Sequence, residues 1–74
     1  MSPDKLAYMA NQIGTFFANQ GEEKATAAIA DHLVKFWDPR MRTALIRYVN
    51  EGGDKLHPFV LAAVRWLEPF PTRR

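Results

Sequence analysis

The most informative part of this chain is the stretch Phe36-Trp37-Asp38-Pro39-Arg40-Met41-Arg42. Asp38 followed by Pro39 is a helix-start signal, because a carboxylate can accept hydrogen bonds from the first N–H groups of a helix and proline fits the first helical position. The expected donors are the N–H groups of Arg40 and Met41. Proline also disfavours helical geometry in the residue before it, so one helix should end as the next begins. The stretch therefore predicts a tight corner between two helices.

Helical periodicity extends to both sides of this corner. Before it, an apolar stripe at helical spacing predicts a helix from about Glu22 to Trp37. After it, a helix from Pro39 to about Glu51 is expected to stop at Gly52-Gly53, because glycine readily adopts a left-handed cap conformation.

Two further helices are predicted at the ends of the chain. The first has Ser2 as its N-cap and Pro3 at its first position, and it ends at Gln20-Gly21. The last begins at Pro58 and is ended by Pro69, which leaves residues 69–74 as a short tail. The predicted fold class is all-α, with residues 1–74 forming a single small four-helix domain.

The predicted core consists of residues on the apolar stripes of these helices. They are Leu6, Ile13, Phe17, Ile29, Leu33, Phe36, Leu45, Tyr48, Val60, Val64 and Leu67. Phe16 lies on the same stripe as Phe17 and is expected to pack inside as well. Ala7, Gly14 and Ala18 form a strip of small side chains, which predicts close approach of a neighbouring helix.

Composition limits what a chain of 74 residues can do. It has no Cys, which excludes disulfides, thiolate metal sites and a cysteine nucleophile. No secretory signal and no run long enough to cross a bilayer is visible, so a cytoplasmic protein without membrane contact is expected. The net charge of +2 includes a mild basic excess in residues 35–74, well short of the Lys/Arg stripe of a dedicated nucleic-acid binder.

No catalytic, cofactor-binding or metal-binding residue is predicted. His32 and His57 share no metal-ligand spacing, and they are expected to lie at the edge of a packed face and at a helix cap, respectively. Glu22 and Glu23 are adjacent on a helix and therefore point about 100° apart, so they are interpreted as favourable charges at a helix N-terminus. An enzyme acting on its own is not expected.

The residues that favour binding are aromatics and arginines. A domain this small has little interior, so several of its aromatic rings are expected to stay partly exposed unless a partner covers them. Trp and Arg are also enriched at binding hot spots. The predicted partner contacts are Trp37, Arg40 and Arg42 at the corner, and Phe59 and Trp66 on the flank of the last helix. The alternative interpretation is core packing for the aromatics and ordinary solvated charge for the arginines.

Three stretches carry a resemblance to a known family. They are Tyr8-Met9-Ala10-Asn11-Gln12-Ile13-Gly14-Thr15-Phe16-Phe17, His32-Leu33-Val34-Lys35-Phe36-Trp37-Asp38-Pro39-Arg40-Met41-Arg42, and Gly52-Gly53 followed by Leu56, Pro58, Val60 and Ala63. Together they resemble the delta subunit of NAD-dependent, molybdenum-containing formate dehydrogenase, from about Lys5 to Leu67.

The resemblance implies a non-catalytic accessory subunit of a cytoplasmic enzyme complex. Its expected partners are the other formate dehydrogenase subunits, chiefly the large catalytic one, and its expected role is in assembly, cofactor insertion or stability of the complex. Molybdopterin, iron–sulfur clusters and flavin are expected in those partners and none in this chain. No catalytic residue of the family maps onto the sequence.

Two alternatives remain open from the sequence. One is a free-standing helical module that binds or regulates a different protein. The other is a DNA-binding helical domain using Arg40, Arg42, Arg47 and Arg65. Against the second, Arg42 should point roughly opposite to Arg40 and Arg47, which leaves no continuous basic stripe for a major groove.

Overall fold

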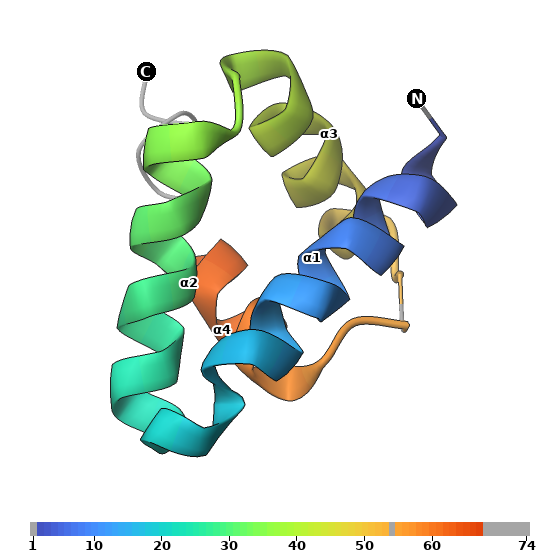
Figure 1. The fold of residues 1–74 in the computed structure, drawn as a ribbon. Helices are drawn as coiled ribbons and strands as arrows, with labels where there is room; N and C mark the ends of the chain where they lie inside the picture. The colour runs from blue at the N-terminus through green and yellow to red at the C-terminus, as the bar shows by residue number, and fades with distance from the viewer. Residues whose placement is uncertain (1, 54, 68–74) are drawn as a thin grey trace.

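A computed structural model describes residues 2–53 and 55–67, and these form helices joined by short connections (Figure 1). The elements are α1 (Pro3–Phe17), a short 3₁₀ turn η1 (Ala18–Gln20), α2 (Glu22–Phe36), α3 (Pro39–Asn50) and α4 (Pro58–Leu67). The described residues contain no strand, and the predicted all-α class and four helices are confirmed. The predicted tail, residues 69–74, lies outside the described residues.

The helix ends follow the local signals in the sequence. The Ser2 side chain accepts a hydrogen bond from the Lys5 N–H at 3.2 Å, and Asp38 Oδ1 accepts from the Met41 N–H at 2.9 Å. The bond expected from the Arg40 N–H does not accompany it. Gly21 and Gly52 have positive φ values of 93° and 89°, a region that glycine enters without a Cβ clash, so they turn the chain after η1 and α3.

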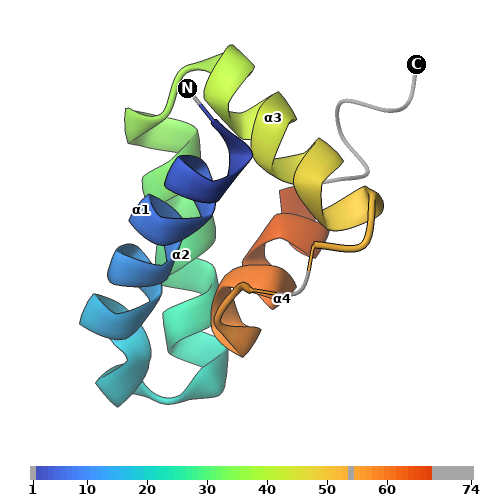
Figure 2. The same cartoon turned by 90° about the vertical axis from the view of Figure 1, so that its right-hand side faces the viewer.

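The helices pack as a compact array in which α1 and α4 each contact the three others. Figure 1 shows α2 along one side of the molecule with α1 crossing in front of α4, and Figure 2 shows α1 and α2 on the left with α3 and α4 on the right. The most extensive packing between two helices is that of α2 against α4. The predicted close approach at the small-residue strip occurs between α1 and α4. A Cβ placed on Gly14 would lie 2.6 Å from Val60 Cγ2, which explains why glycine stands there.

Most of the predicted core is confirmed. Leu6, Ile29, Leu33, Leu45, Val60 and Val64 are buried. Ile13, Phe17 and Leu67 are partly buried and pack against that cluster. Tyr48 is half-buried, and a Cβ on Gly53 would collide with its ring, so the turn that follows α3 packs closely against Tyr48.

Two predictions of core packing are wrong, because Phe16 is 75% exposed and Phe36 is 72% exposed. In both cases the chain has two large aromatic side chains in succession at the end of a helix. On α1, the side chains of Phe16 and Phe17 point about 100° apart, so a narrow buried face takes only one of them. At the end of α2, the chain leaves helical geometry at Trp37, which turns that ring inward and leaves Phe36 outside. The core takes part of Phe17 and nearly all of Trp37, and the neighbouring phenyl ring is left in solvent.

Candidate protein-interaction site

Trp37, predicted to contact a partner, is instead a core residue of the corner. It is the C-cap of α2 and leaves helical geometry at φ −93° and ψ 136°. Only 5% of Trp37 is exposed, and it belongs to the central apolar cluster together with Leu33 and Leu45. The prediction that its indole offers surface to a partner is therefore corrected.

Arg42 also serves the corner, since its guanidinium points back onto the end of α2. Its Nη1 donates to the carbonyl oxygens of Leu33 at 3.3 Å, Val34 at 3.0 Å and Trp37 at 2.6 Å. The last carbonyls of a helix have no intrahelical partner and carry the negative end of the helix dipole, so a cation there is favourable. Arg42 thus caps α2 from α3 and has a structural role that the sequence did not predict, while its contact with a partner stays a prediction.

Replacement of Arg42 by Ala is expected to lower the free energy of unfolding by about 1.5–3 kcal/mol, because hydrogen bonds from a charged group contribute in this range. Urea unfolding followed by circular dichroism measures it. The matched control is Arg40→Ala, which removes the same side chain from the exposed first turn of α3 and should change stability by less than about 0.5 kcal/mol. Equal stability of the two variants would contradict the capping role.

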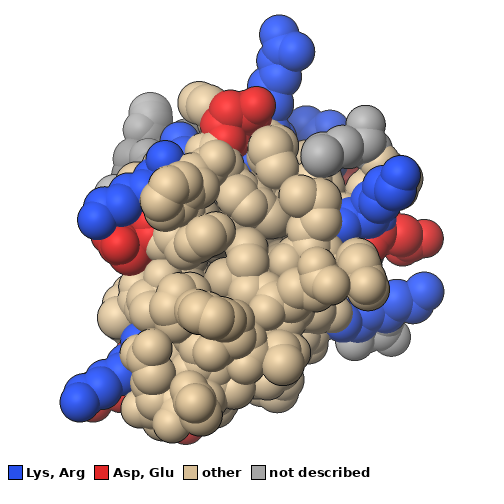
Figure 3. All heavy atoms as spheres, in the orientation of Figure 1, with Lys and Arg blue, Asp and Glu red and all other residues tan. Residues whose placement is uncertain are grey.

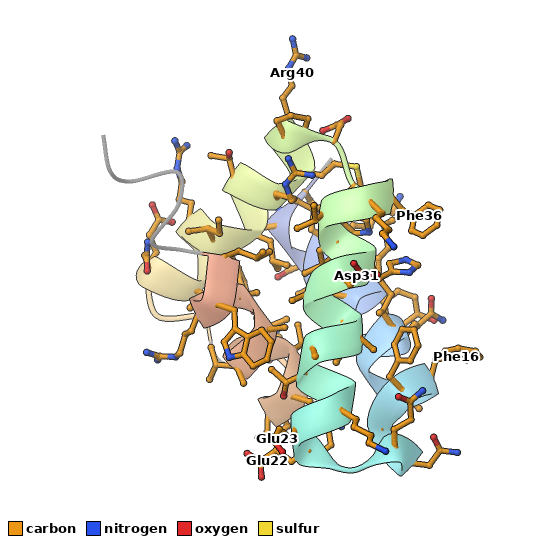
Figure 4. All side chains as sticks on the ribbon, turned by 90° about the vertical axis from the view of Figure 1, so that its left-hand side faces the viewer. Phe16, Glu22, Glu23, Asp31, Phe36 and Arg40 are labelled. Carbon is orange, nitrogen blue, oxygen red and sulfur yellow. The ribbon has the colours of Figure 1, made fainter. Side chains whose placement is uncertain are left out.

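Arg40 points away from the body of the protein at the start of α3, as Figure 4 shows. It lines a shallow hollow of about 370 Å³ on the exposed side of α3, together with Arg47 and the uncharged Pro39, Thr43 and Ala44. Because Arg42 turns to the opposite side, α3 carries two arginines on its outer face and no continuous basic stripe, as the sequence predicted.

Phe59 and Trp66 differ in how much surface they leave accessible. Phe59 is half-buried against the core, and its ring lies 4.9 Å from that of His57 at an interplanar angle of 62°. The Phe59 N–H donates to His57 Nδ1 at 3.0 Å, which confirms His57 as the cap of α4. Trp66 is 49% exposed and lines a groove of about 430 Å³ between α2 and α4.

Asn11 ties α1 to the connection between α3 and α4, a link that helical periodicity did not predict. Its Nδ2 donates to the Lys55 carbonyl at 2.7 Å, and its Oδ1 accepts from the His57 N–H at 2.7 Å. The sequence separation of 44 to 46 residues explains why local patterns could not reveal it. This side chain holds the entry to α4 in place.

Phe16 and Phe36, the exposed rings that sequence reasoning placed in the core, belong to one row of rings across α1 and α2 that also includes Phe17 and His32. The ring centroids are 5.0 Å apart from Phe16 to Phe17, 6.3 Å from Phe17 to His32 and 4.8 Å from His32 to Phe36. We call these four residues the aromatic row. Phe16, Phe17 and His32 border a groove of about 390 Å³, the α1–α2 groove, whose other lining residues are Met9, Gln12, Ile13 and Trp37. The signal in the sequence that could have predicted these exposed rings is the occurrence of two successive aromatic residues at the ends of both α1 and α2.

The described residues provide neither a metal site nor a membrane-spanning helix. No group of three or more His, Cys, Asp or Glu among residues 2–53 and 55–67 is placed to hold a metal ion. In the same part of the chain, no helix combines the length and hydropathy needed to cross a membrane.

The fold and these surfaces define a small all-α domain that presents aromatic side chains to solvent. A family model described as "NADH-dependant formate dehydrogenase delta subunit FdsD" matches residues 5–64. The chain therefore belongs to the family of formate dehydrogenase delta subunits, and the resemblance read from the sequence is confirmed. Neither the comparison with curated proteins nor that with solved structures gave a match.

Proposed function

We propose that this chain is a non-catalytic accessory subunit of a cytoplasmic, NAD-dependent formate dehydrogenase complex. Its role would be to support assembly, cofactor insertion or stability of the catalytic subunits, with the large catalytic subunit as its main partner. The observation that carries the proposal is the family match over residues 5–64. In this proposal, molybdopterin, iron–sulfur clusters and flavin belong to the partner subunits.

Surface chemistry supports a binding role. Five large apolar side chains are exposed on a chain of 74 residues: Tyr8, Phe16, Val34, Phe36 and Trp66. Tyr8 and Phe16 line hollows along α1, whereas Val34 and Trp66 line the groove between α2 and α4. Exposed apolar surface of this kind on a small domain is typical of a protein-interaction site. Of the contacts predicted from the sequence, Arg40 and Trp66 keep accessible side chains and remain proposed contacts, while Phe59 can contribute only its exposed edge.

Affinity purification of the tagged full chain from cells that produce the enzyme tests this function. We expect the catalytic subunits to co-purify and the eluate to reduce NAD with formate, while the chain purified alone does neither and holds no stoichiometric molybdenum or iron. In cells lacking the chain, the molybdenum content or the yield of the catalytic subunits should fall at least about 10-fold. Normal amounts of fully loaded enzyme in those cells would contradict the proposal.

The DNA-binding alternative has a separate test. Binding of a labelled duplex is measured while the salt concentration is raised, because contacts to phosphate are lost steeply with salt. Specific binding that survives physiological salt would favour this alternative, and weak binding that disappears would leave only a mildly basic surface.

A further inference from the structure

The face of the molecule that carries α1 is uncharged over much of its area. Figure 3 shows its centre and lower part built from uncharged side chains, with Lys, Arg, Asp and Glu around the edges. Figure 4, turned by 90°, shows the labelled Phe16 and Phe36 projecting from this same side of the molecule, one from each of α1 and α2. Phenylalanine is among the residues most often buried, so two rings exposed by more than 70% on one face call for a partner.

The aromatic row is held in place before any partner arrives. Its ring centroids lie 4.8–6.3 Å apart, and Phe16 and Phe17 meet edge to face at 82°. These separations fall in the range where aromatic pairs attract one another. Phe17 is partly buried against the core and anchors the row. A surface that is ordered in advance loses little conformational entropy when it binds, which favours affinity.

The surface also has an elongated, hollowed shape. Beside the α1–α2 groove lies a second hollow of about 500 Å³, lined by Tyr8, Asn11, Gln12, Thr15 and Phe16. Phe16 lines both hollows, so they follow one another along α1. All residues lining them belong to the described part of the chain, whereas α4 and its groove end at Leu67, where that part stops.

We propose that this face receives the apolar side of an uncharged helical segment from another subunit of the formate dehydrogenase complex. The inference rests on the proposed function and names the surface and the kind of partner element. No Lys, Arg, Asp or Glu lines the two hollows, so a charged segment would be buried there without a counter-ion from these residue types, which is costly.

A helix is the occupant that this surface fits. The walls of the groove are the helices α1 and α2, whose interior N–H and C=O groups are already hydrogen-bonded within each helix, so an extended segment would find no strand edge to pair with. A helix satisfies its own backbone and offers side chains at i, i+3, i+4 and i+7 to a groove. The side-chain ridges of such a helix would pack into the groove between α1 and α2, as the ridges of one helix pack into the grooves of another in a protein core.

The exposed area favours a larger partner over a second copy of this chain. Tyr8, Phe16 and Phe36 are 63%, 75% and 72% exposed, and together they offer about 400 Å² when an aromatic side chain has about 200 Å² to bury. A stable interface of standard size buries about 800 Å² on each partner. A symmetric dimer held by these three rings alone would therefore fall short, whereas a larger subunit can add contacts on every side of them.

The test uses the tagged full chain with Phe16→Ser and Phe36→Ser combined, in cells that produce the enzyme. We expect at least a 10-fold loss of co-purifying formate dehydrogenase subunits. The control is Asn50→Ser, which changes an exposed side chain at the end of α3 that lines neither hollow, and it should bind as the wild type does. Circular dichroism checks the fold; should the double variant unfold, the two single substitutions provide the same comparison.

The remaining outcomes separate this inference from the proposed function. Wild-type co-purification by the double variant overturns the inference and leaves the function standing. Failure of the wild-type chain itself to bring down any formate dehydrogenase subunit overturns the function, and the inference with it. An isolated wild-type chain that sediments as a dimer, and a double variant that sediments as a monomer, would assign the face to a second copy and also overturn the inference.

Discussion

Trp37→Ala is expected to lower the free energy of unfolding by about 3–5 kcal/mol, the usual cost of removing a buried tryptophan side chain. Trp37 is 5% exposed and fills the space between the end of α2 and the core. A chain of this length has a total stability of about 4–11 kcal/mol, so the loss would be a large share of it. The measurement is urea unfolding at 25 °C, followed by helical circular dichroism.

The matched control is Trp66→Ala, which removes the same side chain from a position that is 49% exposed. It should cost clearly less than Trp37→Ala, because much of its surface is already in water. A Trp37→Ala variant that keeps wild-type stability but no longer joins the complex would restore Trp37 as a partner contact, and would mean that the structure has buried the wrong aromatic at the corner.

Leu33→Ala is expected to cost about 2–5 kcal/mol, the range for a fully buried leucine replaced by alanine. The Leu33 side chain is 0% exposed in the middle of the core. The size of the loss depends on how far the surrounding side chains can collapse into the space that the leucine leaves.

The neighbouring residue provides the control for this substitution. Val34 is 51% exposed, so Val34→Ala removes apolar atoms from the same helix turn with a loss of less than about 1 kcal/mol. If the two variants unfolded at the same urea concentration, the orientation of α2 about its own axis would be wrong.

The corner between α2 and α3 forms as the sequence predicted, but Trp37, which was predicted to contact a partner there, is buried in the core. Asp38 caps α3, Arg42 reaches back to the last carbonyls of α2, and Trp37 fills the core between them. All three of these side chains therefore stabilise the corner itself. The exposed aromatic surface lies instead on α1 and α2, where Phe16 and Phe36 were expected to be inside.

Local sequence signals were sufficient to predict the four helices and most of the residues on their buried faces. The caps at Ser2 and Asp38 and the turns at Gly21 and Gly52 act within a few residues, so they can be read without knowing the tertiary structure. The spacing of apolar residues predicted burial of Ile29, Leu33 and Val64 for the same reason, because helical geometry alone places them on one side. The family could also be predicted from the sequence, because three stretches of it resemble formate dehydrogenase delta subunits, and the family match confirms this.

The choice between adjacent aromatics and the long-range hydrogen bonds depended on how the helices pack. Whether Phe36 or Trp37 enters the core is decided by the chain leaving helical geometry at Trp37, a change of direction that helical periodicity does not contain. The bonds from Asn11 to the backbone of Lys55 and His57 join residues far apart in the chain, and the three carbonyl contacts of Arg42 require the angle between α2 and α3. Periodicity assigns a side chain to a face of its own helix, and only the packed neighbours determine whether that face meets protein or water.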